Sequence, residues 1–498
     1  VLCLARAFAA GDASRSVELA IVSNHVHKVL GCEWLAPEKS TLLGPCMAIR
    51  QEYPNVRTRA IDIELPATEA ERQALALRIL GEMFCPDTHL FVAFRNGERW
   101  VQCHEPLGDS SAGSGPLPVR ERGVYLITGG LGRIGRAISE WLASRYRARL
   151  VLVGRSPLRG ALHQAGEPDT GDLCGPRCQT IRNIQALGGE VAYLPANVAD
   201  GAAMRGVVEE TVRRFGELHG VIHAAGIVGD GAYREVKDCG FGHAAAHFES
   251  KALGVLALEQ ALNGRTLDFA VLMSSLSAVL GGVGQSPYAA ANLFLDAFAH
   301  SRHSSALPWL SVDWDVWRVH DDGATARMAG GTLQDLGMNV DEATRMLETV
   351  LRLGHARQLI VSTGDLESRI DQWIRLPSVD TNPSSVRRSA AAPPVALTGV
   401  DAIDVPRSEL ETVIADIWCR VLGIARVGLQ DDFAQLGGHS LLAIRIVTEL
   451  RALYRIDLPV RALFEAPTVA QLAQYITRQI ECEIEALSED EAQRLVRA

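Results

Sequence analysis

Polar side chains in the middle of the chain have the types needed to reduce a carbonyl group. Ser275 ends an apolar run, Tyr288 opens a helix-like segment, and Asn292 follows Tyr288 by four residues. Reduction needs a donor that protonates the carbonyl oxygen while hydride arrives at carbon, and Tyr288 carries such a proton. Because a free tyrosine has a pKa of about 10, this chemistry near neutrality also requires a nearby cation.

Lys251 is the cation that the sequence offers. The chain has four lysines, and Lys251 lies in a helical segment directly before the strand that ends at Ser275. A compact ammonium suits a place beside a phenol better than a forked guanidinium. We therefore expect Tyr288 to donate the proton, Ser275 to hold the same oxygen and Lys251 to lower the pKa of the tyrosine. Asn292, one helical turn after Tyr288, would hold the lysine or a relay water.

A glycine-rich turn predicts a dinucleotide site. The segment TGGLGRIG (128–135) follows the apolar strand 124–128 and opens a helix at 133–146. Glycines at such a turn let the backbone approach a pyrophosphate at the helix N-terminus, where free amides and the helix dipole favour anions. A tight turn without a ligand is the alternative. The expected contacts are Thr128, Gly130, Leu131, Gly132, Ile134 and Gly135.

The residues after the next strand predict which dinucleotide binds. Strand 149–154 is followed by Arg155 and Ser156. Sites for NAD usually place a carboxylate here for the ribose 2′-hydroxyl, whereas an arginine suits a 2′-phosphate. We therefore expect NADPH, with a solvated surface arginine as the alternative.

Strands alternate with helices through the first three quarters of the chain, which predicts an α/β fold with doubly wound parallel sheets. A first group of strand-like runs lies at 17–24, 57–65 and 88–94, with a helix at 69–84. A second, longer group lies at 124–128, 149–154, 190–196, 218–226, 268–275 and 309–315.

Composition and pattern divide the chain into five parts. Residues 376–405 are rich in Pro, Ser and Ala, which is typical of a linker, and 406–480 have a helical pattern without strands. The expected parts are a first α/β part at 1–120, a catalytic α/β part at 121–375, the linker at 376–405, a helical domain at 406–480 and a tail at 481–498.

The spacing of the four reactive residues resembles the ketoreductase domains of modular polyketide synthases. Ser275 follows Lys251 by 24 residues, and Tyr288 follows Ser275 by 13. In that family the lysine and asparagine positions are exchanged relative to ordinary short-chain dehydrogenases. The resemblance covers about residues 5–375 and implies a Rossmann-like fold. Its first part, 1–120, would be a non-catalytic structural half whose first strands are missing at the N-terminus.

The same resemblance implies further contacts. HAAG (223–226) fits the family, which places Ala224, Ala225 and Gly226 at the cofactor, and Asn197 with Val198 at the adenine end. The family often has Asp at position 197, so we expect an altered affinity there. For stereochemistry, Asp230 is retained from an acidic triplet, and Leu280 stands where the opposite class has Trp, which favours a D-hydroxy product.

Ser440 is the expected site of a covalent cofactor. It follows a Gly-Gly turn at the start of a helix in DDFAQLGGHSLLAIRIVTEL (431–450), where an isolated serine would be only an N-cap. With its flanking segments, the region resembles a four-helix acyl or peptidyl carrier domain. The resemblance implies 4′-phosphopantetheine on Ser440, attached by a phosphopantetheinyl transferase.

Bulk composition excludes several classes of protein. The net charge of −10 argues against nucleic-acid binding, and no run of 18 apolar residues predicts a membrane helix. The scattered cysteines favour a reduced, cytoplasmic protein. The pairs Cys174/Cys178 and His243/His247 lack further ligands in sequence, so we expect free thiols, a packed or surface histidine pair and no metal.

Together these features predict a polyketide synthase segment, or a hybrid with nonribosomal peptide synthesis, that reduces a β-ketoacyl thioester to a β-hydroxyacyl thioester. The start at Val1 suggests a piece of a longer polypeptide. Expected partners are upstream ketosynthase and acyltransferase domains, a downstream module or release domain, and a second copy in a homodimer. Two alternatives stay open: an inactive reductase scaffold beside a working carrier, and a free-standing reductase of small ketones.

Overall fold

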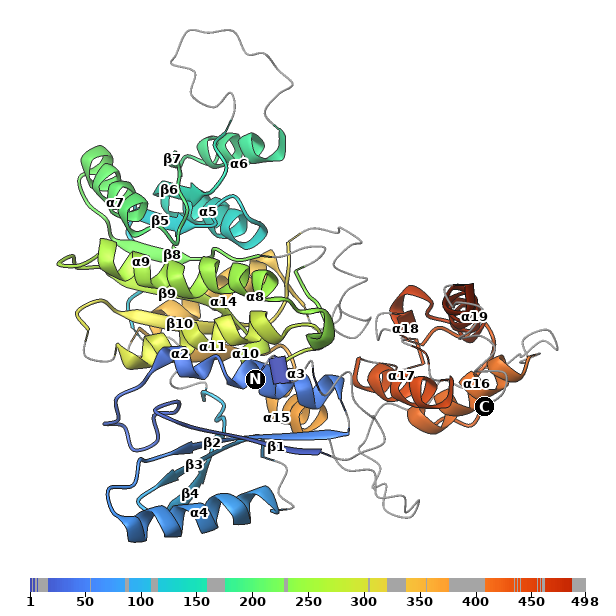
Figure 1. Cartoon of the computed structure of the whole chain (residues 1–498). Coiled ribbons are helices and arrows are strands. Elements are labelled where there is room, and N and C mark those ends of the chain that lie inside the picture. The colour runs from blue at the N-terminus through green and yellow to red at the C-terminus, as the bar shows by residue number, and fades with distance from the viewer. Residues whose placement is uncertain are drawn as a thin grey trace. The chain divides into compact units, whose positions relative to one another are not determined.

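The computed structural model divides the chain into two compact units (Figure 1). The first contains the described residues up to 319 together with those of 337–375, and the second contains those from 408 onward. The described residues are 1, 3–4, 7, 17–53, 55–85, 89–108, 115–158, 175–227, 232–302, 305–319, 337–354, 356–375, 408–433, 435–436, 438, 440–454, 456, 458 and 462–485.

A sheet of seven parallel strands forms the centre of the first unit, in the order β13-β10-β9-β8-β5-β6-β7. The chain starts in the middle at β5, winds outward through β6 and β7, and then returns to the other side of β5 at β8. Carboxyl ends of strands on the two sides of such a reversal border the crevice where α/β sheets bind ligands. The strands are β5 (Val124–Thr128), β6 (Arg149–Gly154), β7 (Glu190–Pro195), β8 (Gly220–His223), β9 (Phe269–Ser275), β10 (Trp309–Trp314) and β13 (Gln358–Val361).

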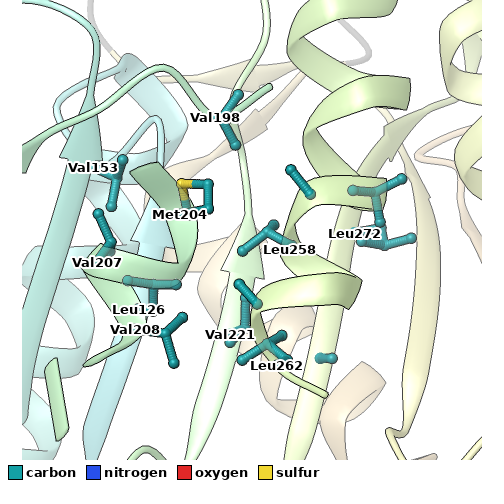
Figure 2. Close-up of a cluster of buried hydrophobic side chains, with 14 of the residues drawn as sticks. Leu126, Val153, Val198, Met204, Val207, Val208, Val221, Leu258, Leu262 and Leu272 are labelled. Atoms are coloured by element: carbon teal, nitrogen blue, oxygen red, sulfur yellow. The ribbon is translucent and has the colours of Figure 1, made fainter. Parts of the chain in front are cut away.

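Helices cover both faces of this sheet. Leu126 of β5 packs with Val207 of α7 and Leu258 of α9 in the cluster that Figure 2 shows. Its neighbour Ile127 points to the opposite face and packs with Ile138 of α5. Because both faces are covered, β5 is buried at every position and is mostly apolar. The helices are α5 (Arg133–Tyr146), α6 (Gly175–Ala186) and α14 (Val340–Arg352) on the Ile127 face, and α7 (Gly201–Phe215), α9 (Gly254–Ala261) and α11 (Ser286–Ser301) on the Leu126 face.

A smaller sheet precedes the central one. Strands β1 (Val17–Asn24), β2 (Val56–Ile63) and β3 (Phe91–Arg95) are parallel, and β4 (Glu98–Val101) is antiparallel to β3. The β3–β4 turn consists of Asn96 and Gly97, both with positive φ, as a tight hairpin turn requires. The sequence pattern did not predict β4, although Asn-Gly between two short runs is a hairpin signal. Helices α2 (Pro37–Ser40), α3 (Leu43–Glu52) and α4 (Glu69–Met83) complete this part.

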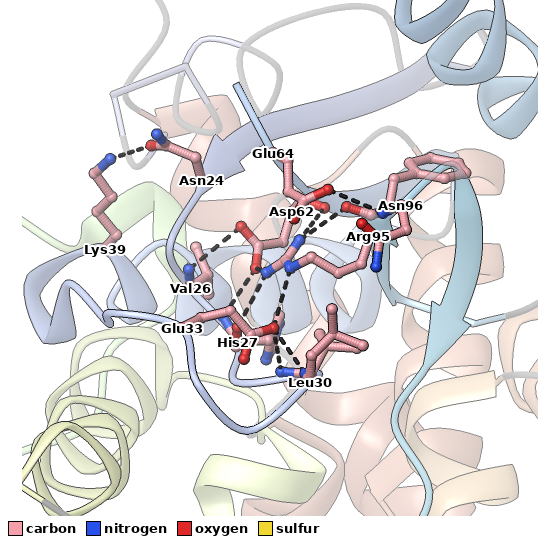
Figure 3. A network of polar contacts seen from close by, with 12 residues as sticks. Asn24, Val26, His27, Leu30, Glu33, Lys39, Asp62, Glu64, Arg95 and Asn96 are labelled. Carbon is pink, nitrogen blue, oxygen red and sulfur yellow. Dashed lines mark hydrogen bonds and ion pairs between the residues drawn. The ribbon is translucent and has the colours of Figure 1, made fainter. Parts of the chain in front are cut away.

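Charged side chains fill the carboxyl ends of the small sheet (Figure 3). Asp62, at the end of β2, accepts hydrogen bonds from the backbone amides of Val26 and His27 at 3.3 and 2.9 Å. Arg95, at the end of β3, pairs with Asp62 at 2.6 Å and with Glu33 at 3.4 Å. The edge at which parallel sheets bind ligands is therefore closed here by the protein's own buried ion pair.

The second unit is helical in its described residues. It contains α16 (Glu409–Leu422), α17 (Ser440–Tyr454), α18 (Ala462–Glu465) and α19 (Val469–Glu485). Ser408 and Glu411 form a capping box at the start of α16. The side chains of Trp418 and Phe433 pack edge to face in its core, with ring centroids 5.2 Å apart.

The expected fold class is confirmed: Rossmann-like parallel sheets are followed by a helical domain. The expected free thiol at Cys178 is wrong, because this residue is disulfide-bonded, and the cysteines described as free are all elsewhere. Among the described residues, no helix is long and apolar enough to span a bilayer. The expected linker at 376–405 lies outside the described residues, as does most of the tail.

Candidate active site

Helix α11 positions two of the four expected catalytic residues. Pro287 stands in its first turn, where the missing N–H costs no hydrogen bond, and Tyr288 follows. Asn292 lies one turn later on the same face and is fully buried, whereas Tyr288 is partly exposed. The Nδ2 atom of Asn292 donates to Ser277 Oγ at 3.2 Å, which fixes the orientation of the amide.

Ser275 ends β9, next to the start of α11. Its Oγ accepts a hydrogen bond from the backbone amide of Ser277 at 3.2 Å. The polar side chains of Ser275 and Asn292 both act to lower the pKa of Tyr288, which places them near its hydroxyl. The strand end and the helix therefore bring three of the expected residues together.

Lys251 joins this group from a π-helical turn, Glu249–Leu253, between α8 (Phe241–Phe248) and α9. Such turns add a residue to a helix and redirect its side chains, and they are frequent at functional sites. Lys251 Nζ is buried, donates to the carbonyl oxygen of Met273 at 2.8 Å and lies 5.7 Å from the centroid of the Tyr288 ring. All four residues are thus gathered at the carboxyl end of β9.

Burial dominates the protonation of this group. It raises the pKa of Tyr288, and the polar side chains of Ser275 and Asn292 only oppose this effect. The net shift is upward, so the expected lowering by Lys251 is outweighed by burial here and its own contribution stays a prediction. Burial also lowers the pKa of Lys251 to about 8, against the attraction of nearby carboxylates.

Two aromatic side chains that the sequence pattern did not single out for the active site border Tyr288. The rings of Tyr233 and His247 contact it edge to face, with centroids 5.6 and 5.9 Å away. His247 Nε2 donates to the carbonyl oxygen of Ala232 at 2.9 Å, and burial lowers the pKa of His247. This histidine is packed in the wall of the site, as expected for the His243/His247 pair, and the described residues contain no group of three metal-ligating side chains.

The glycine-rich turn after β5 is tightly packed against its neighbours. A Cβ atom on Gly129, whose φ is +67°, would lie 2.7 Å from the carbonyl oxygen of Ala224. A Cβ atom on Gly135 would lie 2.3 Å from the carbonyl oxygen of Gly129. Helix α5 then begins after Gly132 without a side-chain cap, so its first amides face outward as an anion-binding site requires.

Thr128, the last residue of β5, holds this turn in place through a buried hydrogen bond. It is fully buried, and its hydroxyl hydrogen-bonds His223 Nδ1 at 2.7 Å. His223 Nε2 in turn lies 3.3 Å from the carbonyl oxygen of Lys251. The Thr128 side chain therefore links the dinucleotide turn to the lysine segment. Among the other expected turn contacts, Leu131, Gly132 and Ile134 are at least partly exposed, while Gly130 and Gly135 are buried.

A cavity of about 100 Å³ continues from this turn along the carboxyl ends of β6, β7 and β8. It brings together five of the expected cofactor residues, and it also includes Glu249, which the sequence pattern did not single out. The Nδ2 atom of Asn197 donates to Glu249 Oε1 at 2.9 Å, so the expected adenine contact is held by the lysine segment. The five expected residues in its lining are Arg155, Asn197, Val198, Ala225 and Gly226.

The end of β6 presents Arg155 and Ser156 to solvent. Arg155 is exposed and forms no ion pair with any residue that the structure describes. The backbone oxygen of Ser156 accepts a hydrogen bond from the Tyr193 hydroxyl at 2.7 Å. An unpaired guanidinium at this place fits a phosphate on the adenosine ribose.

The remaining expected residues fall partly outside the description. Ser440 is the first residue of α17, where the backbone agrees with a helix-start serine. Asp230 lies outside the described residues. Leu280 is buried near the end of the helical turn Ser277–Leu280 (α10), next to Gly281 with a φ of +66°.

Family models match two parts of the chain. Residues 123–319 match the KR domain, and residues 412–476 match the phosphopantetheine attachment site. The two matches fall on the central sheet and on the helical unit. The chain thus combines a ketoreductase domain with a phosphopantetheine carrier domain, and the resemblance to polyketide synthases is confirmed.

Curated relatives are polyketide synthases. Polyketide synthase PksN of Bacillus subtilis is 25% identical over 88% of this chain, and polyketide synthase GfsB of Streptomyces halstedii is 30% identical over 72%. One component of the phenolphthiocerol/phthiocerol polyketide synthase of Mycobacterium tuberculosis is 28% identical over 96%. The chain spans only 8%, 6% and 24% of these relatives, respectively.

Solved ketoreductase structures share the fold. A ketoreductase domain from the bacillaene assembly line is 23% identical, with a TM-score of 0.60 over 75% of this chain and 84% of that chain. A-type ketoreductases from a modular polyketide synthase are 26% identical, with a TM-score of 0.59 over 75% of this chain and 73% of that chain.

Proposed function

We propose that this chain reduces a β-ketoacyl thioester to a β-hydroxyacyl thioester with NADPH, while the acyl chain is tethered to phosphopantetheine on Ser440. The observation that carries the proposal is the convergence of Tyr288, Ser275, Lys251 and Asn292 at the carboxyl end of β9. The glycine-rich turn and the cavity beyond it lie along the same edge of the sheet. A ketoreductase family match over 123–319 supports this chemistry.

The residues of the chain fit the cofactor. The close backbone packing at Gly129 and Gly135 leaves room only for a hydrogen at each α-carbon, and it brings the amides at the start of α5 into the open. Arg155 would hold the 2′-phosphate, and Asn197 would border the adenine. When bound, NADPH supplies the hydride.

The side chains of the site perform the proton chemistry. The Tyr288 hydroxyl would donate its proton to the carbonyl oxygen, and the Ser275 hydroxyl would hold the same oxygen by a second hydrogen bond. Because burial raises the pKa of Tyr288, the phenol is fully protonated at neutral pH and ready to act as an acid. Lys251 would stabilise the phenolate that forms, and Asn292, whose Oδ1 atom receives no donor from the described residues, would hold the lysine or a relay water.

The carrier domain and the partners follow from the family. We infer that a phosphopantetheinyl transferase loads Ser440, and that ketosynthase and acyltransferase domains act before the reductase and a further module or release domain after it. The full synthase would be a homodimer. Asp230 is proposed as the residue that favours the D-hydroxy product.

The decisive experiment compares the chain with Tyr288→Phe, using NADPH and a short β-ketoacyl thioester, with chiral analysis of the product. The variant keeps the ring and its contacts but loses the proton donor, so we expect the rate to fall at least about a hundredfold. Tyr146→Phe is the matched control, since Tyr146 lies at the far end of α5.

Each outcome decides between two functions. Turnover that depends on the Tyr288 hydroxyl would support the reductase. A folded wild-type chain that binds NADPH without turnover would contradict it and leave an inactive scaffold beside a working carrier.

A further inference from the structure

Two aspartates lie buried behind the active site, one on the helix that carries Tyr288 and Asn292 and one on the strand next to β9. Asp296 follows Asn292 by one more turn of α11, and Asp313 lies on β10, next to β9. They are 5% and 0% exposed, respectively. Two buried carboxylates cannot both stay charged unless cations or donors compensate them, so their presence needs a physical explanation.

Strand register places Asp313 beside the lysine site. Asp313 pairs with Ser274 across the β9–β10 ladder, and the preceding residue of β9, Met273, accepts the hydrogen bond from Lys251 Nζ at 2.8 Å. Asp296 and Asp313 both attract the charge of Lys251. The pair therefore faces the buried ammonium from α11 and β10.

The hydrogen bonds of the pair indicate a shared proton. Ser311 Oγ donates to Asp296 Oδ1 at 2.6 Å, and Gln358 Nε2 donates to Asp313 Oδ2 at 2.7 Å. The two remaining oxygens, Asp296 Oδ2 and Asp313 Oδ1, are buried and receive no donor from the described residues. Ser311, which binds Asp296, and Asp313 lie two residues apart on β10 and so on the same face of the strand, which makes the two carboxyl groups neighbours. A single proton between them would satisfy both of these oxygens.

Protonation of the pair agrees with this geometry. Burial raises the pKa of Asp313 to about 6. Burial, and then the charge of Asp313, raises the pKa of Asp296 further. At neutral pH the pair then carries one proton and one negative charge. The other groups around Lys251 offer no anion to replace it: they are the neutral rings of His223, His247 and Tyr288. Glu249, on the lysine's own turn, is bonded to Asn197.

We propose that Asp296 and Asp313 share one proton and one negative charge, and that this charge keeps Lys251 protonated and in place behind Tyr288. The two aspartates are thereby positioning residues of the reductase, because they act on the reaction through the lysine. This inference rests on the proposed function, in which Lys251 acts as an ammonium.

Lysine NMR tests the proposal without turnover. The chain has four lysines, Lys28, Lys39, Lys237 and Lys251, so [13Cε]lysine labelling gives four signals, and Lys251→Arg assigns the one of interest. In the wild type this signal should titrate near pH 8. In Asp296→Asn/Asp313→Asn the midpoint should fall by at least about one pH unit, because the counter-charge is gone.

Single variants distinguish a shared proton from two independent carboxylates. In Asp296→Asn the amide imitates the protonated partner, and in Asp313→Asn the charge moves to Asp296. Each single variant should therefore shift the Lys251 midpoint by less than about half a unit. A shift of a full unit or more in either single variant would overturn the shared proton, even if the double variant did not fold.

Kinetics supply the second readout. The alkaline limb of the kcat/KM profile should move with the Lys251 midpoint, so a shift of one unit makes the double variant about fivefold slower than wild type at pH 8 and nearly equal at pH 6. Asp315→Asn is the control: this aspartate lies on the same segment but pairs with Arg369 at 2.6 Å, so its loss should lower stability and leave the profile unchanged.

The outcomes separate this proposal from the proposed function. An unshifted Lys251 signal in the folded double variant would refute the role of the pair, whatever the activity. A shifted signal in a chain without reductase activity would uphold the charge coupling and refute the reductase instead.

Discussion

Single side chains decide the chemistry at the edge of the central sheet, and Arg155 is the one on which the proposed choice of dinucleotide depends. Its guanidinium is exposed at the end of β6 and is unpaired within the described part of the chain. A free guanidinium can form two charge-assisted hydrogen bonds to a phosphate but has no comparable partner in an unphosphorylated ribose.

Arg155→Gln should therefore weaken NADPH binding by roughly ten- to a hundredfold and leave NADH binding almost unchanged. Fluorescence titration with each nucleotide measures both affinities. Arg205→Gln on the exposed side of α7 is the control and should alter neither. An equal loss for the two nucleotides would argue against a contact with the 2′-phosphate.

His223 makes the stability of the protein depend on pH. Burial, and then the charge of Lys251, lowers its pKa to about 3 from the ordinary value of 6.5. Below pH 6.5 the unfolded chain therefore binds a proton at His223, whereas the folded chain leaves this residue unprotonated until the pH approaches 3. The free energy of unfolding should fall by about 1.4 kcal/mol for each pH unit that the solution is acidified below this range, until pH 3 is approached.

His223→Gln isolates this contribution. The variant loses the bond to Thr128 and should be less stable at every pH, but its stability should decline less steeply between pH 6 and pH 4. Urea unfolding across this range measures the two slopes. Parallel slopes would show that His223 titrates alike in the folded and unfolded chain. Other buried histidines, such as His300, are present in both proteins, so their effects cancel in the difference between the two slopes.

At the scale of elements, the strand–turn–helix formed by β5 and α5 depends on close approach of backbone to backbone. At Gly135 the space for a side chain is already taken by the carbonyl oxygen of Gly129, at 2.3 Å, and by Gly130 Cα, at 2.8 Å. Since both are backbone atoms, neither can move aside without shifting the turn that would receive the pyrophosphate.

Gly135→Ala should consequently lower the free energy of unfolding by about 1–3 kcal/mol and reduce nucleotide affinity. Gly206→Ala is a matched change in the middle of α7, where nothing lies within 4 Å of the added atom. It should raise stability by about 1 kcal/mol, because alanine favours the helix. Thermal unfolding with and without NADPH measures both effects, and equal behaviour of the two variants would contradict the packing argument.

At the scale of the whole molecule, the sites proposed for reduction and for tethering fall in separate compact units. The reductase edge is built from the central sheet and its helices, while Ser440 begins a helix of the second unit.

Ser440→Ala should abolish covalent loading by a phosphopantetheinyl transferase and leave reduction of a free thioester within about twofold of wild type. Intact-mass measurement after incubation with coenzyme A checks the first, and NADPH oxidation checks the second. A mass gain in the variant would place the attachment elsewhere, and a loss of reduction would show that the units are coupled.

Much of this structure follows from local pattern. The runs at 124–128 and 149–154 coincide with β5 and β6, because strands buried on both faces are largely apolar. The strand-like run at 17–24 coincides with β1, although that strand is only partly buried. Helix α5 likewise has the expected bounds, since its start is set by the turn before it and not by distant contacts. The sequence spacing also placed Lys251, Ser275, Tyr288 and Asn292 in one site.

Tertiary structure alone decided how these residues are charged and held. The sequence determined which groups meet; it did not show that burial would outweigh the lysine at Tyr288, because burial depends on what packs around a phenol from distant segments. The π-helical turn that aims Lys251, the bond from Asn197 to Glu249 and the pairing of Asp296 with Asp313 likewise join segments far apart in the chain. The protonation state of a buried group depends on which distant segments pack around it, and a local pattern of residues does not specify this packing.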